Sequence, residues 1–193
     1  MRELDLRDKS CPIPLVETRK FINNNKGEDF KIVLSNEVSF LNIKRFLENN
    51  KINYSSNKNG DNYIFEIIFD GNETIPNEKY EINNLTILIM SDVFGDGDEE
   101  ISKTLMKSYF YALDESITLP SNLIFMNSGV KLLTKECGVL NYIKSLENKG
   151  VSILACGICT DYYNLNEKIT IGNITNMYSI IEILNNSGSV IRI

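Results

Sequence analysis

The chain has 193 residues, of which 42% are hydrophobic and 24% are charged, and its net charge at pH 7 is -6. This composition is ordinary for a globular protein, and the negative balance argues against direct, sequence-independent binding of nucleic acid, which needs a basic surface. No apolar run is long enough to span a bilayer, and the charged first ten residues lack the apolar stretch of a signal peptide, so we expect a cytoplasmic protein.

Residues 1–70 have the pattern of a small α/β domain. Leu4 and Leu6 alternate with charged residues, as in a short strand. The later elements follow from hydrophobic spacing, from Asn36 as a helix cap and from a turn signal at 59–61. We expect a helix from Pro12 to about Asn24, a strand over 30–34, a helix after Asn36, and strands over 51–55 and 63–69. The order β-α-β-α-β-β predicts a two-layer sandwich with both helices on one face of the sheet.

The polar stretch 71–84 is predicted to be a linker, and residues 85–193 have a different pattern. Mostly apolar runs, typical of parallel strands that are buried on both faces, occur at 85–90, 123–126 and 151–155. Helices are expected over 99–115, 134–148 and 175–185, and a last strand over 190–193. This alternation predicts a doubly wound α/β domain with a mainly parallel sheet, which binds ligands at the carboxyl ends of its strands.

The tetrapeptide Cys11-Pro12-Ile13-Pro14 stands where the first strand gives way to the first helix. Proline is tolerated in the first helical turn, so the motif predicts a rigid helix start with Cys11 at or near the N-cap. There the helix dipole and the N–H groups of Ile13 and Leu15 would favour a reactive thiolate. Nearby cations add positive charge: Arg7, Lys9, Arg19 and Lys20. The alternative is a small buried cysteine in a turn shaped by the prolines.

Histidine is absent from the chain. This excludes Ser-His-Asp and Cys-His catalysis, as well as imidazole metal sites. Any nucleophile must therefore be activated by a helix dipole, by local charge or by a carboxylate. We expect no cofactor.

A second cysteine motif, Cys156-Gly157-Ile158-Cys159, directly follows the third strand of the second domain. A CxxC pair at this sheet edge can form a disulfide, relay a persulfide or supply half of a zinc site. Zinc would need two further thiolates from Cys11 and Cys137, so no metal is expected. The alternative is a pair of partly buried cysteines beside a glycine turn.

Two loops face the same edge of the predicted sheet. Residues 91–98 contain three aspartates and no Gly-Lys-Ser/Thr ending, so a solvated loop that caps the next helix is expected rather than a phosphate site. Asn127 and Gly129 follow the second strand, and with Gly157 they are expected to help line a shared pocket. Cys137 is expected near the start of the following helix as an ordinary half-buried cysteine.

The first domain resembles the TusA/SirA-like sulfur-carrier family. The resemblance rests on Leu4-Asp5-Leu6-Arg7, on Cys11-Pro12-Ile13-Pro14 and on Thr18-Arg19-Lys20. It implies a two-layer α/β fold in which Cys11 carries sulfur as a persulfide between donor and acceptor proteins. The sequence departs from the family at Asp8, where glycine is usual.

The second domain resembles the DsrE-like family. The resemblance rests on the segments 156–163 and 172–178. The order of the two domains resembles the YedF-type proteins, which are described as sulfurtransferase-like selenium metabolism proteins. It implies association into homo-oligomers through the DsrE-like domain.

Together these features predict a sulfur- or selenium-trafficking protein. Cys11 would carry the chalcogen, Cys159 would accept it, and Cys156 would resolve the intermediate. Charged residues near the motif would orient donor and acceptor proteins or tune the local charge: Asp5, Arg7, Arg19 and Lys20. The alternatives are a thiol–disulfide redox protein or sensor that uses the CxxC pair, and an interaction module without enzymatic activity. Sulfur and selenium use the same thiol chemistry, so the sequence does not separate them.

Overall fold

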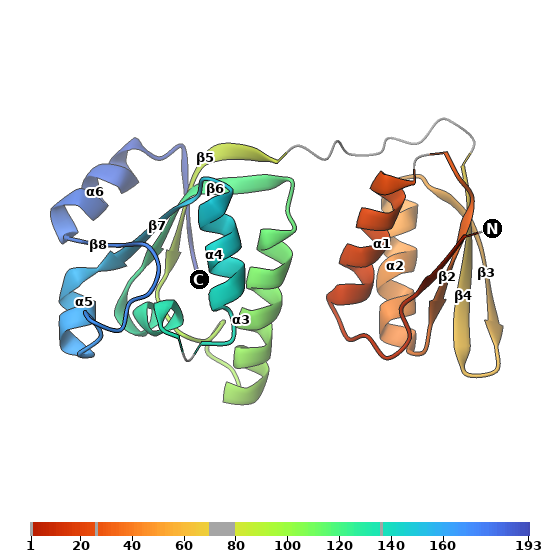
Figure 1. Cartoon of the computed structure of the whole chain (residues 1–193), viewed down its shortest axis with the longest axis horizontal. Coiled ribbons are helices and arrows are strands. Elements are labelled where there is room, and N and C mark those ends of the chain that lie inside the picture. Colours follow the sequence, from red (N-terminus) through yellow and green to blue (C-terminus); the bar gives the residue numbers. More distant parts are fainter. Residues whose placement is uncertain (1, 26, 70–79, 136) are drawn as a thin grey trace. The chain divides into compact units, whose positions relative to one another are not determined.

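A computed structural model of the chain describes residues 2–25, 27–69, 80–135 and 137–193. The chain divides into two compact units, Met1–Glu78 and Lys79–Ile193 (Figure 1). Among the residues described, no helix is both long enough and apolar enough to cross a membrane.

The N-terminal unit is a four-stranded mixed sheet with both helices on one face (Figure 1). Its elements are β1 (Arg2–Asp5), α1 (Ile13–Asn24), β2 (Phe30–Leu34), α2 (Glu37–Asn49), β3 (Asn53–Asn59) and β4 (Asn62–Ile68). The strand order is β1-β2-β4-β3, with β1 parallel to β2 and the other pairs antiparallel. The predicted β-α-β-α-β-β order is therefore confirmed, and so is the hairpin whose turn contains Gly60 at φ 60°.

Packing between the helices and the sheet stabilises this unit. Ile43 and Leu47 of α2 are buried with Phe65 of β4, whose ring stacks on Phe40 at a centroid distance of 4.7 Å. The Asn36 side chain caps α2 by accepting the N–H of Ser39 at 2.8 Å. This cap is the one that the sequence predicts.

The apolar spacing that predicts α2 does not place all of its members in the core. Leu47 is buried, but the side chains of Val38 and Leu41 are 63% and 40% exposed. These two residues lie on the first two turns of α2 and form an exposed apolar patch. The core residue of this part of the helix is Ile43.

The C-terminal unit is built on a five-stranded sheet in which all neighbours are parallel, in the order β8-β7-β6-β5-β9. The elements of its first half are β5 (Glu81–Ile89), α3 (Glu99–Asp114), β6 (Thr118–Phe125), the 3-10 helix η1 (Asn127–Leu133) and α4 (Leu140–Asn148). Those of the second half are β7 (Ser152–Cys156), α5 (Gly157–Tyr162), β8 (Asn173–Thr175), α6 (Met177–Asn186) and β9 (Ser189–Arg192). The predicted doubly wound α/β domain is confirmed.

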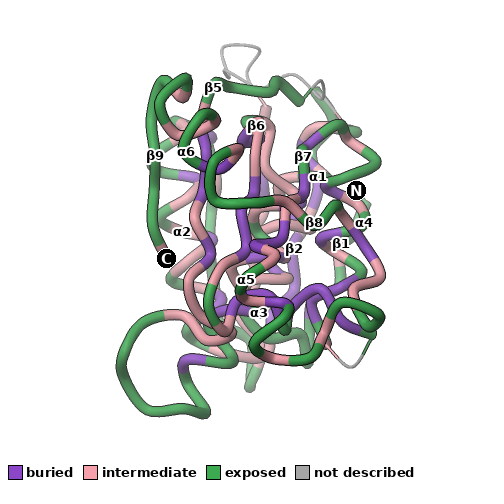
Figure 2. The backbone as a smooth tube through the Cα atoms, turned by 90° about the vertical axis from the view of Figure 1, so that its left-hand side faces the viewer, coloured by how far each residue is buried: buried purple, intermediate pink, exposed green. Residues whose placement is uncertain are grey.

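Helices cover both faces of this sheet. Met106 and Phe110 of α3 and Ile143 of α4 are buried against one face. Ile180 of α6 is buried with Ile124 on the other. Buried residues concentrate along the central strands, whereas β9 at the sheet edge is exposed along its length (Figure 2). This pattern explains why the apolar runs of the central strands are nearly continuous in the sequence.

Several element boundaries differ from the prediction. The sequence predicts a linker over 71–84, and of these residues 71–79 lie outside the described part of the chain. Residues 81–84 belong to β5, because the polar start of this strand extends it and pairs Glu81 with Thr118 of β6. The helix expected over 134–148 begins only at Leu140, after turns that follow η1. The short elements α5 and β8 were not predicted.

Candidate functional site

Cys11 lies at the beginning of α1 and is exposed. Pro12 occupies the N-cap position, so Cys11 stands one residue before the cap. The Cys11–Pro12 peptide bond is cis. The N–H of Ile13 donates to the Ser10 carbonyl at 3.1 Å. The prediction that this N–H is available to the thiol is therefore wrong, because the turn before the helix uses it.

The thiol has a hydrogen-bond partner that the sequence does not indicate. Asn42 Nδ2 on α2 donates to Cys11 Sγ at 3.8 Å. Sulfur accepts hydrogen bonds weakly, and the amide is placed to donate to whatever group this sulfur carries. The contact arises because α1 and α2 pack side by side on the same face of the sheet, which brings together residues 31 positions apart.

The charged residues near Cys11 are partly neutralised by one another. Arg7 binds the Asp5 carboxylate with two nitrogens, Nη2 at 2.6 Å and Nε at 2.9 Å. This contact lowers the pKa of Asp5 to about 2 and raises that of Arg7. Lys20 Nζ lies 3.9 Å from Glu17 Oε1 one turn away on α1. The net positive charge near Cys11 is therefore smaller than the number of nearby Arg and Lys residues indicates.

Asp8 occupies a backbone conformation that favours glycine. Its φ is 61°, and its N–H donates to Ser35 Oγ at 2.9 Å. Aspartate is one of the few other residues that enter this left-handed region at modest cost. The departure from the family glycine therefore leaves the loop geometry intact and adds an exposed carboxylate three residues before Cys11.

The second cysteine pair lies at the carboxyl edge of the parallel sheet. Cys156 ends β7 and is buried, and Cys159 lies within α5 and is half-buried. The backbone N–H of Asn127 donates to Cys159 Sγ at 3.0 Å. Asn127 has a φ of 49°, and its side-chain oxygen accepts the Tyr163 hydroxyl at 3.2 Å. The structure thus brings the predicted residues Asn127 and Cys159 into direct contact.

The Cys159 thiol is mainly protonated near pH 7. Burial raises its pKa above the ordinary value, and the N–H of Asn127 acts in the opposite direction. The Cys156 thiol raises the pKa further through a hydrogen bond and its charge, so the two side chains are in contact. This environment protects the pair from indiscriminate reaction.

The two predicted pocket glycines are required by close packing. A side chain at Gly129 would place its Cβ 2.3 Å from the carbonyl oxygen of Ile89. At Gly157 the corresponding distance to the Thr175 carbonyl oxygen is 3.1 Å. Gly129 lets η1 pass directly over the end of β5, and Gly157 lets α5 start beside β8.

Cys137 lies in the turn before α4 rather than within the first helical turn. It is half-buried, and burial raises the pKa of its thiol. All four cysteines are free thiols. Within the described ranges, no three Cys, Asp or Glu side chains come together in a way that could hold a metal ion.

Comparisons with known proteins agree with the two-unit architecture. A family model described as Sulfurtransferase TusA matches residues 2–68, and one described as the DsrE/DsrF-like family matches residues 83–193. A Methanocaldococcus jannaschii protein named as a candidate sulfur carrier protein is 39% identical over 51 residues, which are 26% of this chain and 68% of that protein.

Two solved structures are similar to parts of the chain. A SirA-like protein from Desulfitobacterium hafniense is 18% identical, and the match covers 35% of this chain and 96% of that one, with a TM-score of 0.33. The ychN protein from E. coli is 13% identical, and the match covers 57% of this chain and 99% of that one, with a TM-score of 0.43.

A methyl group at Gly129 is expected to destabilise the C-terminal unit. Gly129→Ala should lower its free energy of unfolding by roughly 1–3 kcal/mol, because the added Cβ meets backbone that cannot move aside. Gly138→Ala is the matched control, since its Cβ would have no atom within 4 Å. Thermal unfolding of both variants measures the difference, and equal stability of the two would contradict the packing argument.

The raised pKa of Cys159 predicts how its reactivity depends on pH. Only the thiolate reacts, so below the pKa the rate should rise about tenfold per pH unit between roughly pH 7 and 8.5. Alkylation by iodoacetamide, followed at the Cys159 peptide by mass spectrometry, measures this slope. A rate that reaches its plateau below about pH 8 would mean that the thiol ionises at a lower pH than its burial allows.

Proposed function

The chain belongs to the DsrE/DsrF-like family and carries a TusA sulfurtransferase domain, and from this premise we propose that it traffics sulfur or selenium on Cys11. The adduct is a persulfide or its selenium counterpart. The observation that carries the proposal is the exposed Cys11 thiol at the start of α1, with the Asn42 amide donating to its sulfur. Exposure gives a donor protein access, and the amide stabilises the anion that forms.

Loading of Cys11 is a thiol exchange. The Cys11 thiolate attacks the outer sulfur of a donor persulfide, the donor's S–S bond breaks, and the donor thiolate leaves. The product is a Cys11 persulfide whose terminal sulfur carries the negative charge. No redox cofactor is needed for this step, because the outer sulfur keeps its oxidation state.

The surface around Cys11 is suited to contact with other proteins. Val38 and Leu41 are exposed on the same helix as Asn42, and Leu41 directly precedes it in the chain. An apolar patch beside a reactive group is a common feature of docking surfaces. The charged residues Asp5, Arg7, Arg19 and Lys20 would orient the donor and acceptor proteins on this surface.

Cys159 is the proposed acceptor within the C-terminal unit. Its thiolate would attack the outer sulfur of a persulfide and release the carrier as a thiolate. The N–H of Asn127, 3.0 Å from Cys159 Sγ, would stabilise the anionic sulfur during the transfer. Cys156 would then attack the inner sulfur of the Cys159 persulfide, expel hydrosulfide and form a Cys156–Cys159 disulfide. A cellular thiol must reduce this disulfide before the next cycle, which suits a cytoplasmic protein.

The C-terminal unit also has a surface suited to self-association. Tyr178 and Ile181 of α6 are 74% and 48% exposed, and Ile174 of β8 and Met177 are exposed close to them in sequence. This apolar surface, together with the edge strand β9, would be covered by a second copy of the chain. Covering it would remove from water a patch that a monomer leaves open.

Loading of Cys11 can be tested by intact-mass and peptide mass spectrometry. The protein is incubated with a cysteine desulfurase and cysteine, and in parallel with a selenocysteine lyase and selenocysteine. We expect the mass of one chalcogen atom on Cys11, and none there in Cys11→Ser. Asn42→Leu should slow loading roughly threefold to tenfold, because a hydrogen bond to an anionic sulfur is lost.

The matched control for Asn42 is Asn23→Leu or Asn49→Leu, in which an amide elsewhere on the two helices is replaced. A folded protein that gains no chalcogen on Cys11 from either donor would overturn the proposal. Equal loading of the Asn42 and control variants would show that the amide contact is unimportant.

Self-association can be tested by light scattering after size-exclusion chromatography. Wild type should elute as an oligomer, and Ile181→Glu should elute as a monomer, because a buried unpaired charge opposes assembly. Glu182→Ala changes the neighbouring exposed residue and should leave the assembly intact. A monomeric wild type would contradict this part of the proposal.

A further inference from the structure

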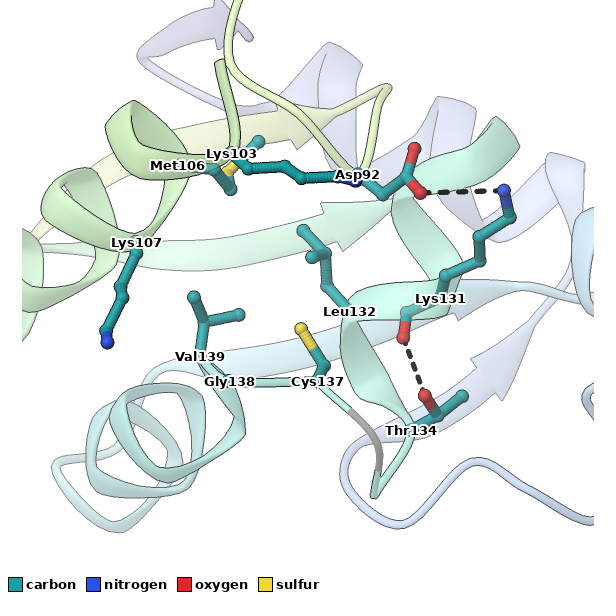
Figure 3. A pocket seen from close by; sticks show the side chains of 10 residues that line it. All are labelled: Asp92, Lys103, Met106, Lys107, Lys131, Leu132, Thr134, Cys137, Gly138 and Val139. Carbon is teal, nitrogen blue, oxygen red and sulfur yellow. Dashed lines mark hydrogen bonds and ion pairs between the residues drawn. The ribbon is translucent and has the colours of Figure 1, made fainter. Parts of the chain in front are cut away.

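The C-terminal unit has a pocket of about 410 Å³ that does not contain the Cys156–Cys159 pair. It lies between α3, η1 and the turn before α4 (Figure 3). Its volume is within the range that binds small molecules. Its lining residues are Asp92, Lys103, Met106, Lys107, Lys131, Leu132, Thr134, Cys137, Gly138 and Val139.

Three of the lining residues are lysines, in a chain whose net charge is -6. Lys103 and Lys107 are four residues apart on α3, so they stand on the same face of the helix, where like charges repel each other. Lys131 comes from η1 on another wall. An anion in the pocket would be attracted by these side chains.

Acidic side chains offset only part of this charge. Asp92 Oδ2 lies 3.5 Å from Lys131 Nζ, and Glu99 Oε1 lies 2.6 Å from Lys103 Nζ. Among the described residues that line the pocket, Asp92 is the only acidic one. With Glu99 counted as the partner of Lys103, the described side chains have one cationic group in excess, three lysines against two carboxylates.

The rest of the wall is apolar and contains a thiol. Met106, Leu132 and Val139 line the pocket, and Cys137 Sγ points into the same space (Figure 3). Burial raises the pKa of Cys137, the backbone N–H of Val139 acts in the opposite direction, and the nearby Asp92 adds a small increase. The thiol is therefore neutral near pH 7 and does not cancel the charge of the lysines.

We propose that this pocket binds a small organic anion, with its carboxylate among the lysines and its apolar part against Met106, Leu132 and Cys137. The site is independent of sulfur transfer through Cys11 and Cys159. Cys137 then has a role in ligand binding and no role in the transfer of sulfur between cysteines. The lysines supply charge and the apolar wall supplies shape, as in other small-molecule sites.

Two alkylating reagents of nearly equal size can test this proposal at the pocket itself. Iodoacetate is a small carboxylate and iodoacetamide is its neutral counterpart, and both react with the same Cys137 thiolate. Their rates at the Cys137 peptide are measured by mass spectrometry over a range of reagent concentrations. We expect the iodoacetate rate to saturate, because binding precedes reaction, and the iodoacetamide rate to stay linear.

Replacing the α3 lysines should remove this preference for the charged reagent. In the Lys103→Gln/Lys107→Gln double variant, the ratio of iodoacetate to iodoacetamide rates at Cys137 should fall roughly fivefold, as expected for loss of charge at close range. The ratio at Cys11 in the same sample should not change. Lys144→Gln replaces an exposed lysine of α4 outside the pocket and is the matched control.

Three outcomes would overturn the proposal. These are a linear iodoacetate rate at Cys137 in wild type, an unchanged rate ratio in the double variant, and an equal fall in Lys144→Gln. An iodoacetamide rate at Cys137 that is the same in all the proteins would show that the variants remain folded. The double variant should load chalcogen on Cys11 as the wild type does. Failure of the pocket proposal is therefore distinguishable from failure of the proposed function.

Discussion

The close approach of Gly129 to the carbonyl of Ile89 determines the geometry of the thiol site in the C-terminal unit. Because no side chain separates them, η1 begins directly over the carboxyl end of β5. The N–H of Met126 donates to the Ile89 carbonyl at 2.9 Å, and that of Gly129 to the Met126 carbonyl at 3.0 Å. Asn127, the first of the two residues between Met126 and Gly129, adopts a positive φ and directs its own N–H at Cys159 Sγ. A backbone contact at one strand end thus positions a hydrogen-bond donor for a cysteine that follows another strand.

The two thiol sites use amide N–H groups where many cysteine proteins use histidine. Cys11 is exposed and has a side-chain amide from a neighbouring helix as its partner. Cys159 is half-buried, has a backbone amide as its partner, and contacts a second thiol. These environments suit different tasks. An exposed cysteine can meet partner proteins, whereas a shielded cysteine pair reacts only with a substrate that reaches it.

Much of the architecture follows from the sequence, because hydrophobic periodicity depends on local chain geometry. The order of the main strands and helices and the doubly wound second unit were predicted in this way, as was the cap at Asn36. The sequence places the start of β5 too late for a physical reason. Glu81, Asn83 and Asn84 are polar, yet residues 81–84 belong to the strand, in which residues 81–83 pair with β6. Val38 and Leu41 follow helical spacing but lie outside the core, since periodicity alone does not reveal what a helix packs against.

The site was predictable only where it depends on motifs. The spacing of the prolines indicated Cys11, and the CxxC spacing indicated Cys156 and Cys159. Asn42 was missed because its contact with Cys11 depends on the packing of two helices, and no local pattern encodes that contact. The lysines of the pocket were missed for the same reason, since they come together from α3 and η1.

The central claim is that a chalcogen carried by Cys11 reaches Cys159. The most direct measurement loads Cys11 with isotopically labelled sulfur, removes the donor, and follows the label on the Cys11 and Cys159 peptides over time. The account predicts that label leaves Cys11 as it appears on Cys159, that it accumulates on Cys159 in Cys156→Ser, and that it stays on Cys11 in Cys159→Ser. Loss of label from Cys11 at the same rate in wild type and Cys159→Ser, with none on Cys159 in Cys156→Ser, would contradict it.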